Sequence, residues 1–235
     1  MAYTKRNDGR GIEDTRPIEA EVGVVARADG SARFKIGRTE AIAAVYGPKE
    51  MHPRSTADPR QGVLRCNYNM LPFSGSGDRV RPGQNRRAKE LSMVIQNALR
   101  PVVDLTPFPG AVVDIFIEFP QTDAGTRCAG ICAASMALAD AGIVMRDLVA
   151  AVSVGRVDDK IVVDLDYSEE AYEDGPVADI PVAMVNGTGE ITLLQLDGPV
   201  SKEQLQKALK LAEKALKKIN AIQVAALKKK YERSA

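Results

Sequence analysis

Hydrophobic residues follow two different periods along this chain, and the switches between the periods predict its elements. Alternation or short apolar runs predict strands over residues 17–27, 32–37, 39–48, 63–71, 112–119, 149–157, 160–167, 177–185 and 190–198. Helical spacing predicts helices over 86–99, from 128 to 141, and from 201 to the end at 235. No linker or low-complexity tract interrupts this succession. We therefore expect an α/β (α+β) fold of mixed sheets with packed helices, in a single domain over residues 1–235.

The segments between these elements differ in character. Residues 1–16 are polar and charged, so we expect an N-terminal arm. Residues 48–62 and 73–85 form two long loops rich in proline, glycine and arginine, and long loops inside compact domains are usually functional. Ser201 and Gln204 predict a capping box at the start of the C-terminal helix, 201–235. Its apolar stripe covers too few heptads for a coiled coil, so packing on a sheet is favoured.

The stretch from Gln121 to Met145 holds the most informative turn. The apolar run 112–119 enters a helix through the small, polar residues 122–126, which leaves backbone amides at the positive end of that helix. Such an end suits an anion, and Arg127 adds a planar charge that fits phosphate oxygens. The alternative is an ordinary helix N-terminus capped by Asp123 or Thr126.

Composition limits the classes of function. With 45% hydrophobic and 27% charged residues the chain is globular, and a net charge of +1 argues against coating nucleic acid by bulk charge. Three cysteines give no disulfide framework, which favours a reducing, cytoplasmic location. We expect no membrane span and no secretory signal, because no apolar run is long enough and the N-terminus is charged.

Local charge is less even. Six basic residues and one acidic residue lie between Arg79 and Arg100, and most are arginines, which favour bidentate phosphate contacts. A solvated charged loop is the alternative. Tyr68 lies among Arg65, Asn67 and Asn69, where its ring either stacks on an unpaired base or is a half-buried strand tyrosine.

Acidic residues gather between Asp164 and Asp179. Asp179 falls in the apolar run VADIPVAM, where partial desolvation would raise its pKa toward use as a general acid. Other chemistries are poorly supported. The single histidine, His52, is far from Cys128 and Cys132, so neither a zinc site nor a hydrolase triad is expected, and no Walker A sequence is present.

Taken in order, several motifs resemble the RNase PH family of phosphorolytic exoribonucleases, and the resemblance covers nearly the whole chain. The motifs are DGR, TRPIEAEVG, GPKEMHPR, YNMLPFS, NRRAKELS, TDAGTR, ADIPVAM and ITLLQLDG. Their order is closest to the catalytic subunits of the archaeal exosome branch. The resemblance implies an RNase PH-like fold and a 3′-to-5′ exoribonuclease that uses inorganic phosphate to release nucleoside diphosphates from single-stranded RNA.

The resemblance also implies roles for individual residues. Gly125, Thr126 and Arg127 would hold the attacking phosphate together with Arg87. Arg86 and Arg87 would clamp the last RNA phosphates, and Arg65 would be a further RNA-binding residue. Tyr68 matches the position that stacks a base.

This chain follows the family pattern less closely at its acidic positions. Asp179 corresponds to a carboxylate that protonates the leaving 3′ oxygen or positions a divalent metal such as Mg²⁺. The family places its first carboxylate six residues earlier, and this segment is irregular here, so Asp174, Glu173 and Glu170 are all candidates. We choose Asp174, which makes Asp174 and Asp179 the candidate metal ligands.

The family's active subunit pairs with a related, non-catalytic subunit in a hexameric ring, a trimer of heterodimers capped by RNA-binding subunits. The resemblance implies the same partners here. Two alternatives remain: a homohexameric RNase PH that trims tRNA 3′ ends, and a ring subunit that binds RNA without catalysis.

Overall fold

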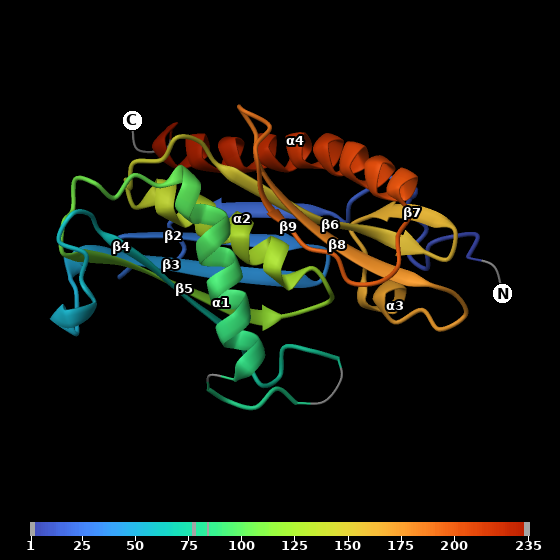
Figure 1. Ribbon diagram of the computed structural model, residues 1–235, viewed down its shortest axis with the longest axis horizontal. Helices are drawn as coiled ribbons and strands as arrows, with labels where there is room; N and C mark the ends of the chain where they lie inside the picture. The colour runs from blue at the N-terminus through green and yellow to red at the C-terminus, as the bar shows by residue number, and fades with distance from the viewer. Residues whose placement is uncertain (1–2, 77–78, 84, 233–235) are drawn as a thin grey trace.

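The computed structural model describes residues 3–76, 79–83 and 85–232, and it contains two β-sheets with helices between and over them (Figure 1). The first sheet has the strand order β1-β2-β3-β5-β4. Its strands are β1 (Ile18–Val22), β2 (Gly30–Ile36), β3 (Thr39–Glu50), β4 (Val63–Met70) and β5 (Ala111–Gln121). β4 runs parallel to β5, whereas the other pairs are antiparallel.

The second sheet is antiparallel throughout and has the order β7-β6-β8-β9. Its strands are β6 (Val149–Val157), β7 (Lys160–Val163), β8 (Val177–Val185) and β9 (Ile191–Leu194). Two of these, β6 and β8, have the predicted bounds. The α/β fold with mixed sheets is therefore confirmed.

The strand predicted over residues 160–167 is too long. It ends at Val163, because Asp164 has a left-handed backbone (φ 56°) that breaks the extended run. The short helix α3 (Tyr167–Glu170) follows, and the carboxylate of Asp166 caps it by accepting a hydrogen bond from the amide of Glu169 at 3.0 Å. This turn points α3 back toward the first sheet's loops instead of extending β7.

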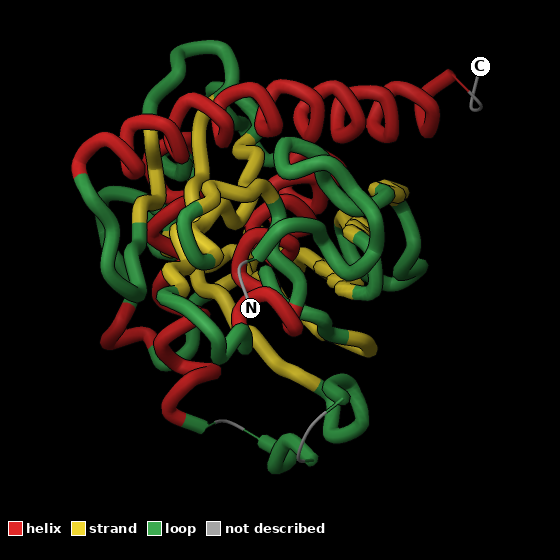
Figure 2. The backbone as a smooth tube through the Cα atoms, turned by 90° about the vertical axis from the view of Figure 1, so that its right-hand side faces the viewer, coloured by secondary structure: helices red, strands yellow, loops and turns green. Residues whose placement is uncertain are grey.

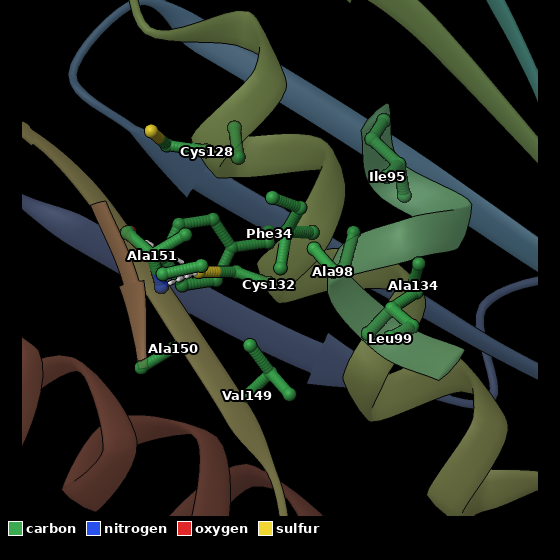
Figure 3. Packing of buried hydrophobic residues seen from close by; sticks show 14 of the residues in the cluster. Phe34, Ile95, Ala98, Leu99, Cys128, Cys132, Ala134, Val149, Ala150 and Ala151 are labelled. Carbon is green, nitrogen blue, oxygen red and sulfur yellow. Dashed lines mark hydrogen bonds between the residues drawn. The ribbon is translucent and has the colours of Figure 1, made fainter. Parts of the chain in front are cut away.

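Helix α2 (Thr126–Asp140) lies between the two sheets and is buried on nearly every side. Its alanines and cysteines let both sheets approach closely, and the buried core runs without a break from the first sheet to the second. Figure 3 shows the packing: Cys132 faces β6, where it exchanges hydrogen bonds with the backbone of Ala151 at 3.2 and 3.4 Å. At Gly30 a Cβ atom would lie 2.1 Å from the amide nitrogen of Ala141, so this approach requires glycine.

The two outer helices match their predictions. α1 (Arg86–Leu99) has the predicted bounds, and the side chain of Asn85 caps it by accepting from the amide of Ala88 at 2.8 Å. α4 (Lys202–Glu232) lies along the second sheet, opposite the described parts of the loop between β4 and α1, residues 71–76 and 79–83 (Figures 1 and 2). The last three residues of the helix predicted over 201–235 lie outside the described residues.

The predicted cap of α4 is confirmed. The amide of Ser201 donates to the side chain of Gln204 at 2.9 Å, and the amide of Gln204 donates to the hydroxyl of Ser201 at 3.2 Å. Two 3₁₀ helices complete the fold, η1 (Arg54–Thr56) in the loop after β3 and η2 (Arg100–Val102) after α1. Within the described part of the chain, no helix has the length and apolarity needed to cross a bilayer.

The N-terminal arm is anchored by a buried ion pair. Arg6 is only 2% exposed, and its Nε and Nη2 atoms donate to the two carboxylate oxygens of Glu169 in α3, each at 2.8 Å. The same guanidinium donates to the carbonyls of Val163 (2.7 Å) and Asp164 (2.6 Å). The arm, predicted over 1–16 and described from residue 3, is therefore part of the second half of the fold.

Removing one partner of this ion pair should destabilise the fold. We expect Arg6→Met to lower the free energy of unfolding by roughly 3–5 kcal/mol, because it leaves the carboxylate of Glu169 buried without its cation. Chemical denaturation followed by circular dichroism would measure the change. The double variant Arg6→Met/Glu169→Gln should regain part of the loss. Equal stability of Arg6→Met and wild type would contradict the anchoring of the arm.

Candidate active site

A pocket of about 750 Å³ opens where the two sheets meet. The first half of the chain supplies the end of β4, the first turn of α1 and the loop that precedes α2. The second half supplies residues of β6, α3 and β8 and the segment after β9. The site therefore depends on how the two halves pack, and neither half contains it alone.

The loop before α2 forms a cradle of backbone amides. Ala124 and Gly125 both have left-handed backbones, with φ of 59° and 64°. They lie in a tight turn, and successive amides of a turn can form an anion-binding concavity. Gly125 is the N-cap of α2 and no side chain caps the helix there. The alternative of a cap by Asp123 or Thr126 is thus wrong. The carboxylate of Asp123 accepts instead from the amide of Tyr167 (3.2 Å), and the hydroxyl of Thr126 accepts from that of Tyr68 (2.9 Å).

Two arginines line the pocket beside this loop. Arg127 lies in the first turn of α2, and its Nη1 donates to the side-chain oxygen of Gln195 at 2.6 Å, which fixes its orientation. Arg87 lies in the first turn of α1. Arg86, its neighbour, is exposed and lies outside the pocket lining. Two cations and a helix N-terminus therefore converge on one volume, which suits a phosphate group.

Asp179 faces these cations from β8. Its pKa is raised by burial, and hydrogen bonding from Ser153 and the charge of Arg127 oppose part of that shift. Its backbone pairs with that of Asp197 at 2.8 and 2.9 Å, which holds the segment after β9 against the pocket. The partly desolvated carboxylate expected from the sequence is present.

The second carboxylate in the pocket is Glu170, on α3. Burial raises its pKa to about 7, the charge of Asp179 contributes further, and Arg127, Arg87 and Arg16 oppose the shift. Asp174, chosen from the sequence, lies in the exposed segment between α3 and β8 and does not line the pocket. The structure therefore favours Glu170 among the three candidates, because α3 turns back toward Asp179 while the following segment turns out to solvent.

Tyr68 and Arg65 do not lie as their predicted roles require. The ring of Tyr68 is only 3% exposed and packs 4.7 Å, centroid to centroid, from that of Phe119, so it presents no free face to a base. The structure favours the strand-tyrosine alternative, with the hydroxyl supporting Thr126. Arg65 lies outside the pocket and pairs with Asp114 on β5 through two contacts of 2.5 and 2.9 Å.

The pocket offers few side chains that could bind a metal ion. Among the described residues no group of three or more histidine, cysteine, aspartate or glutamate side chains is arranged to hold an ion. Asp174 lies outside the pocket and Asp197, which lines it, is exposed, so Glu170 and Asp179 are the half-buried pair that could contribute oxygen ligands. Two carboxylates together with substrate phosphates are a common environment for Mg²⁺.

Two pocket residues, Ser153 and Asp197, and the adjacent Gln195 were not singled out from the sequence. Ser153 bonds to Asp179, Gln195 orients Arg127, and Asp197 pairs with the backbone of Asp179. Each reaches the site through strand pairing in the second sheet. The motif ITLLQLDG contains two of them, but nothing local marks Ser153 within its apolar strand.

Comparison with known proteins agrees with this architecture. Residues 14–144 match the 3′ exoribonuclease family, domain 1, and residues 147–215 match domain 2 of the same family. The boundary between these matches falls between the two sheets described above.

Close relatives cover almost all of the chain. The exosome complex component Rrp41 of Methanopyrus kandleri is 49% identical over 226 residues, which span 96% of this chain and 93% of that protein. The Rrp41 component of Thermococcus gammatolerans is 51% identical over 227 residues, spanning 97% and 90%.

Solved structures show the same fold. Rice Rrp46 superposes with a TM-score of 0.82 at 23% identity, covering 94% of this chain and all of that one. A chain of the Archaeoglobus fulgidus exosome, solved with RNA bound to the active site, gives a TM-score of 0.76 at 24% identity over 92% and 91% of the two chains. From its motifs, its fold and these relatives, the chain belongs to the RNase PH family of 3′ exoribonucleases.

Proposed function

We propose that this pocket catalyses phosphorolysis at the 3′ end of single-stranded RNA and releases nucleoside diphosphates. One observation carries the proposal: a single pocket combines an amide cradle and two arginines with two carboxylates whose pKa values are raised. Phosphorolysis needs both features, since one anion must attack another and an oxygen must leave with a proton.

The cationic side of the pocket meets the first need. An oxygen of inorganic phosphate attacks the last phosphorus, a new P–O bond forms, and the bond from that phosphorus to the preceding 3′ oxygen breaks. Bringing two unit anions to ~4 Å costs about 4 kcal/mol at an effective dielectric near 20. Arg127, held by Gln195, and the amides of Ala124 and Gly125 in the cradle are in place before substrate binds, so they offset this repulsion without reorganising, and Arg87 adds a second cation.

The acidic side meets the second need. The leaving 3′ oxygen takes a proton, and a donor works best when its pKa lies near the working pH. Asp179 and Glu170 share the pocket and each holds its proton to higher pH than a free carboxyl group. We assign donation to this pair, in which the charge of Asp179 helps to raise the pKa of Glu170.

A divalent metal such as Mg²⁺ fits the same place. Asp179 and Glu170 would hold it, and Asp174 would not, because Asp174 lies outside the pocket. When bound, the metal would neutralise negative charge on the phosphate groups. Arg127 and Arg87 orient those groups in either case.

We further propose that the chain works in the cytoplasm within an exosome ring, paired with a related non-catalytic subunit and capped by RNA-binding subunits. Relatives named as exosome components support this. Exposed apolar residues also support a place in a ring. β9 is an edge strand, and its residues Ile191 and Leu194 are 44% and 47% exposed. Met93, on the neighbouring helix α1, is 55% exposed. An apolar edge of this kind is normally covered by a partner.

The function can be tested with an RNA degradation assay, with and without inorganic phosphate, on the chain alone and mixed with a candidate sister subunit. We expect phosphate-dependent release of nucleoside diphosphates only from the mixture. Release by the chain alone would identify a homohexameric enzyme. RNA binding without phosphate-dependent release in either sample would leave a non-catalytic subunit.

Removing the acid on β8 should separate catalysis from binding. We expect Asp179→Asn to lower kcat by roughly 10²–10⁴-fold, the usual contribution of a general acid, with RNA affinity nearly unchanged. Single-turnover assays and RNA binding by fluorescence anisotropy would measure the two effects. A large loss of RNA affinity would instead place Asp179 in the RNA path.

The dependence of kcat on pH should report Glu170. Its pKa in the folded protein is raised to about 7, so its protonated fraction, and with it kcat, should fall as the pH rises through 7. Glu170→Gln should remove this alkaline limb. Phosphate also titrates in this range, so Asp174→Asn, on the exposed segment, serves as the matched control and should keep the wild-type profile. Identical profiles for wild type and Glu170→Gln would exclude Glu170 from proton transfer.

A further inference from the structure

The backbone of the loop before α2 is tied from the side opposite the pocket. Nη1 of Arg16 donates to the carbonyl of Asp123, and the hydroxyl of Thr39, on β3, donates to the carbonyl of Ala124 at 2.7 Å. The same hydroxyl accepts from the amide of Asp123 at 2.9 Å. Arg16 and Thr39 are 5% and 0% exposed, and neither lines the pocket.

These ties fix the direction of the amides that follow. In a trans peptide the N–H group points opposite to the carbonyl of the same peptide plane. With the carbonyls of Asp123 and Ala124 held toward Arg16 and Thr39, the amides of Ala124 and Gly125 turn to the other side, where both residues line the pocket. The two left-handed backbones of the cradle are the conformations that this arrangement requires.

Arg16 is itself fixed by Asp164. Its Nε and Nη2 atoms donate to the two carboxylate oxygens of Asp164 at 2.9 and 2.6 Å, and its backbone amide donates to the same carboxylate at 2.7 Å. This bidentate contact uses one edge of the planar guanidinium and leaves Nη1 for the loop. A lysine offers one ammonium group and cannot hold both partners in this geometry.

Asp164 places this contact at the junction of the two halves. It follows β7 of the second sheet and lies two residues before Asp166, the N-cap of α3, which carries Glu170. Arg16 therefore links the cradle, which belongs to the first sheet, to the segment that carries one of the pocket acids.

We propose that Arg16 is a positioning residue that sets the affinity for inorganic phosphate by holding the amides of the cradle toward the pocket. The proposal rests on the phosphorolytic function proposed above. A purely structural arginine, which only anchors the N-terminal arm, would affect stability without singling out phosphate.

The test compares Arg16→Lys with Arg10→Lys in steady-state assays of the assembled complex. Arg10 lies on the same arm and also contacts Asp164, through Nη1 at 3.3 Å, but among the described residues it makes no contact with the cradle. We expect Arg16→Lys to raise the KM for phosphate by roughly tenfold or more, a usual effect of displacing supporting groups, with the KM for RNA little changed. Arg10→Lys should leave both near wild type.

A second variant tests the same contacts in case Arg16→Lys impairs folding. Thr39→Val keeps the shape of the side chain and removes both of its hydrogen bonds to the loop, so it should also raise the KM for phosphate. Thermal melting in the presence of phosphate should show a smaller stabilisation for Arg16→Lys and Thr39→Val than for wild type.

The outcomes separate this inference from the proposed function. A wild-type complex that shows neither phosphate-dependent degradation nor stabilisation by phosphate would overturn both. An active wild type, with Arg16→Lys and Thr39→Val unchanged or weakened equally toward phosphate and RNA, would overturn the role of Arg16 alone.

Discussion

The burial of α2 is the constraint on which the rest of the structure depends. A helix that is apolar on nearly every side must be covered on every side, so one sheet cannot stabilise it and two sheets close around it. Its N-terminus then emerges where the sheets meet. Because that end carries unpaired amides and Arg127, the packing requirement of the core also brings an anion site next to the acids of the second sheet.

Much of this could be predicted from the sequence because it follows from local periodicity. α1, β6 and β8 have the expected bounds, and the cap of α4 has the expected partners. The strands predicted over 17–27 and 190–198 are shorter, since β1 ends at Val22 and β9 at Leu194. The helix α3 was not predicted, because at four residues it is too short for a periodic signal. It forms because buried contacts from the N-terminal arm hold Asp164 in a left-handed conformation, and such distant contacts leave no local pattern.

The site was predictable to the extent that its residues form a continuous motif. Gly125, Thr126 and Arg127 line one pocket with Arg87 and Asp179, and the roles expected of them stay predictions. Tyr68 could not be assigned, because alternation along β4 does not say whether the ring is covered, as it is here by Phe119. The partner carboxylate of Asp179, chosen as Asp174, could not be identified by counting residues back from Asp179. Spacing along the chain does not tell which residues of an irregular segment point into the pocket. Ser153 acts through Asp179 and has no motif of its own, and Arg16, although it belongs to the motif TRPIEAEVG, carries no local signal of its contact with the loop before α2.

The irregular segment between α3 and β8 has a consequence for how this family can vary. On one side a capping box fixes α3, and on the other the backbone pairing of Asp179 with Asp197 fixes β8. A change of length between these two fixed points has to keep Tyr172 against Tyr3, where the ring centroids are 5.6 Å apart, but it does not have to move the pocket acids. The exposed residues Glu173 and Asp174 are thus where a longer segment would leave the chemistry in place, and where a fluorophore or affinity tag could be inserted into an assembled particle.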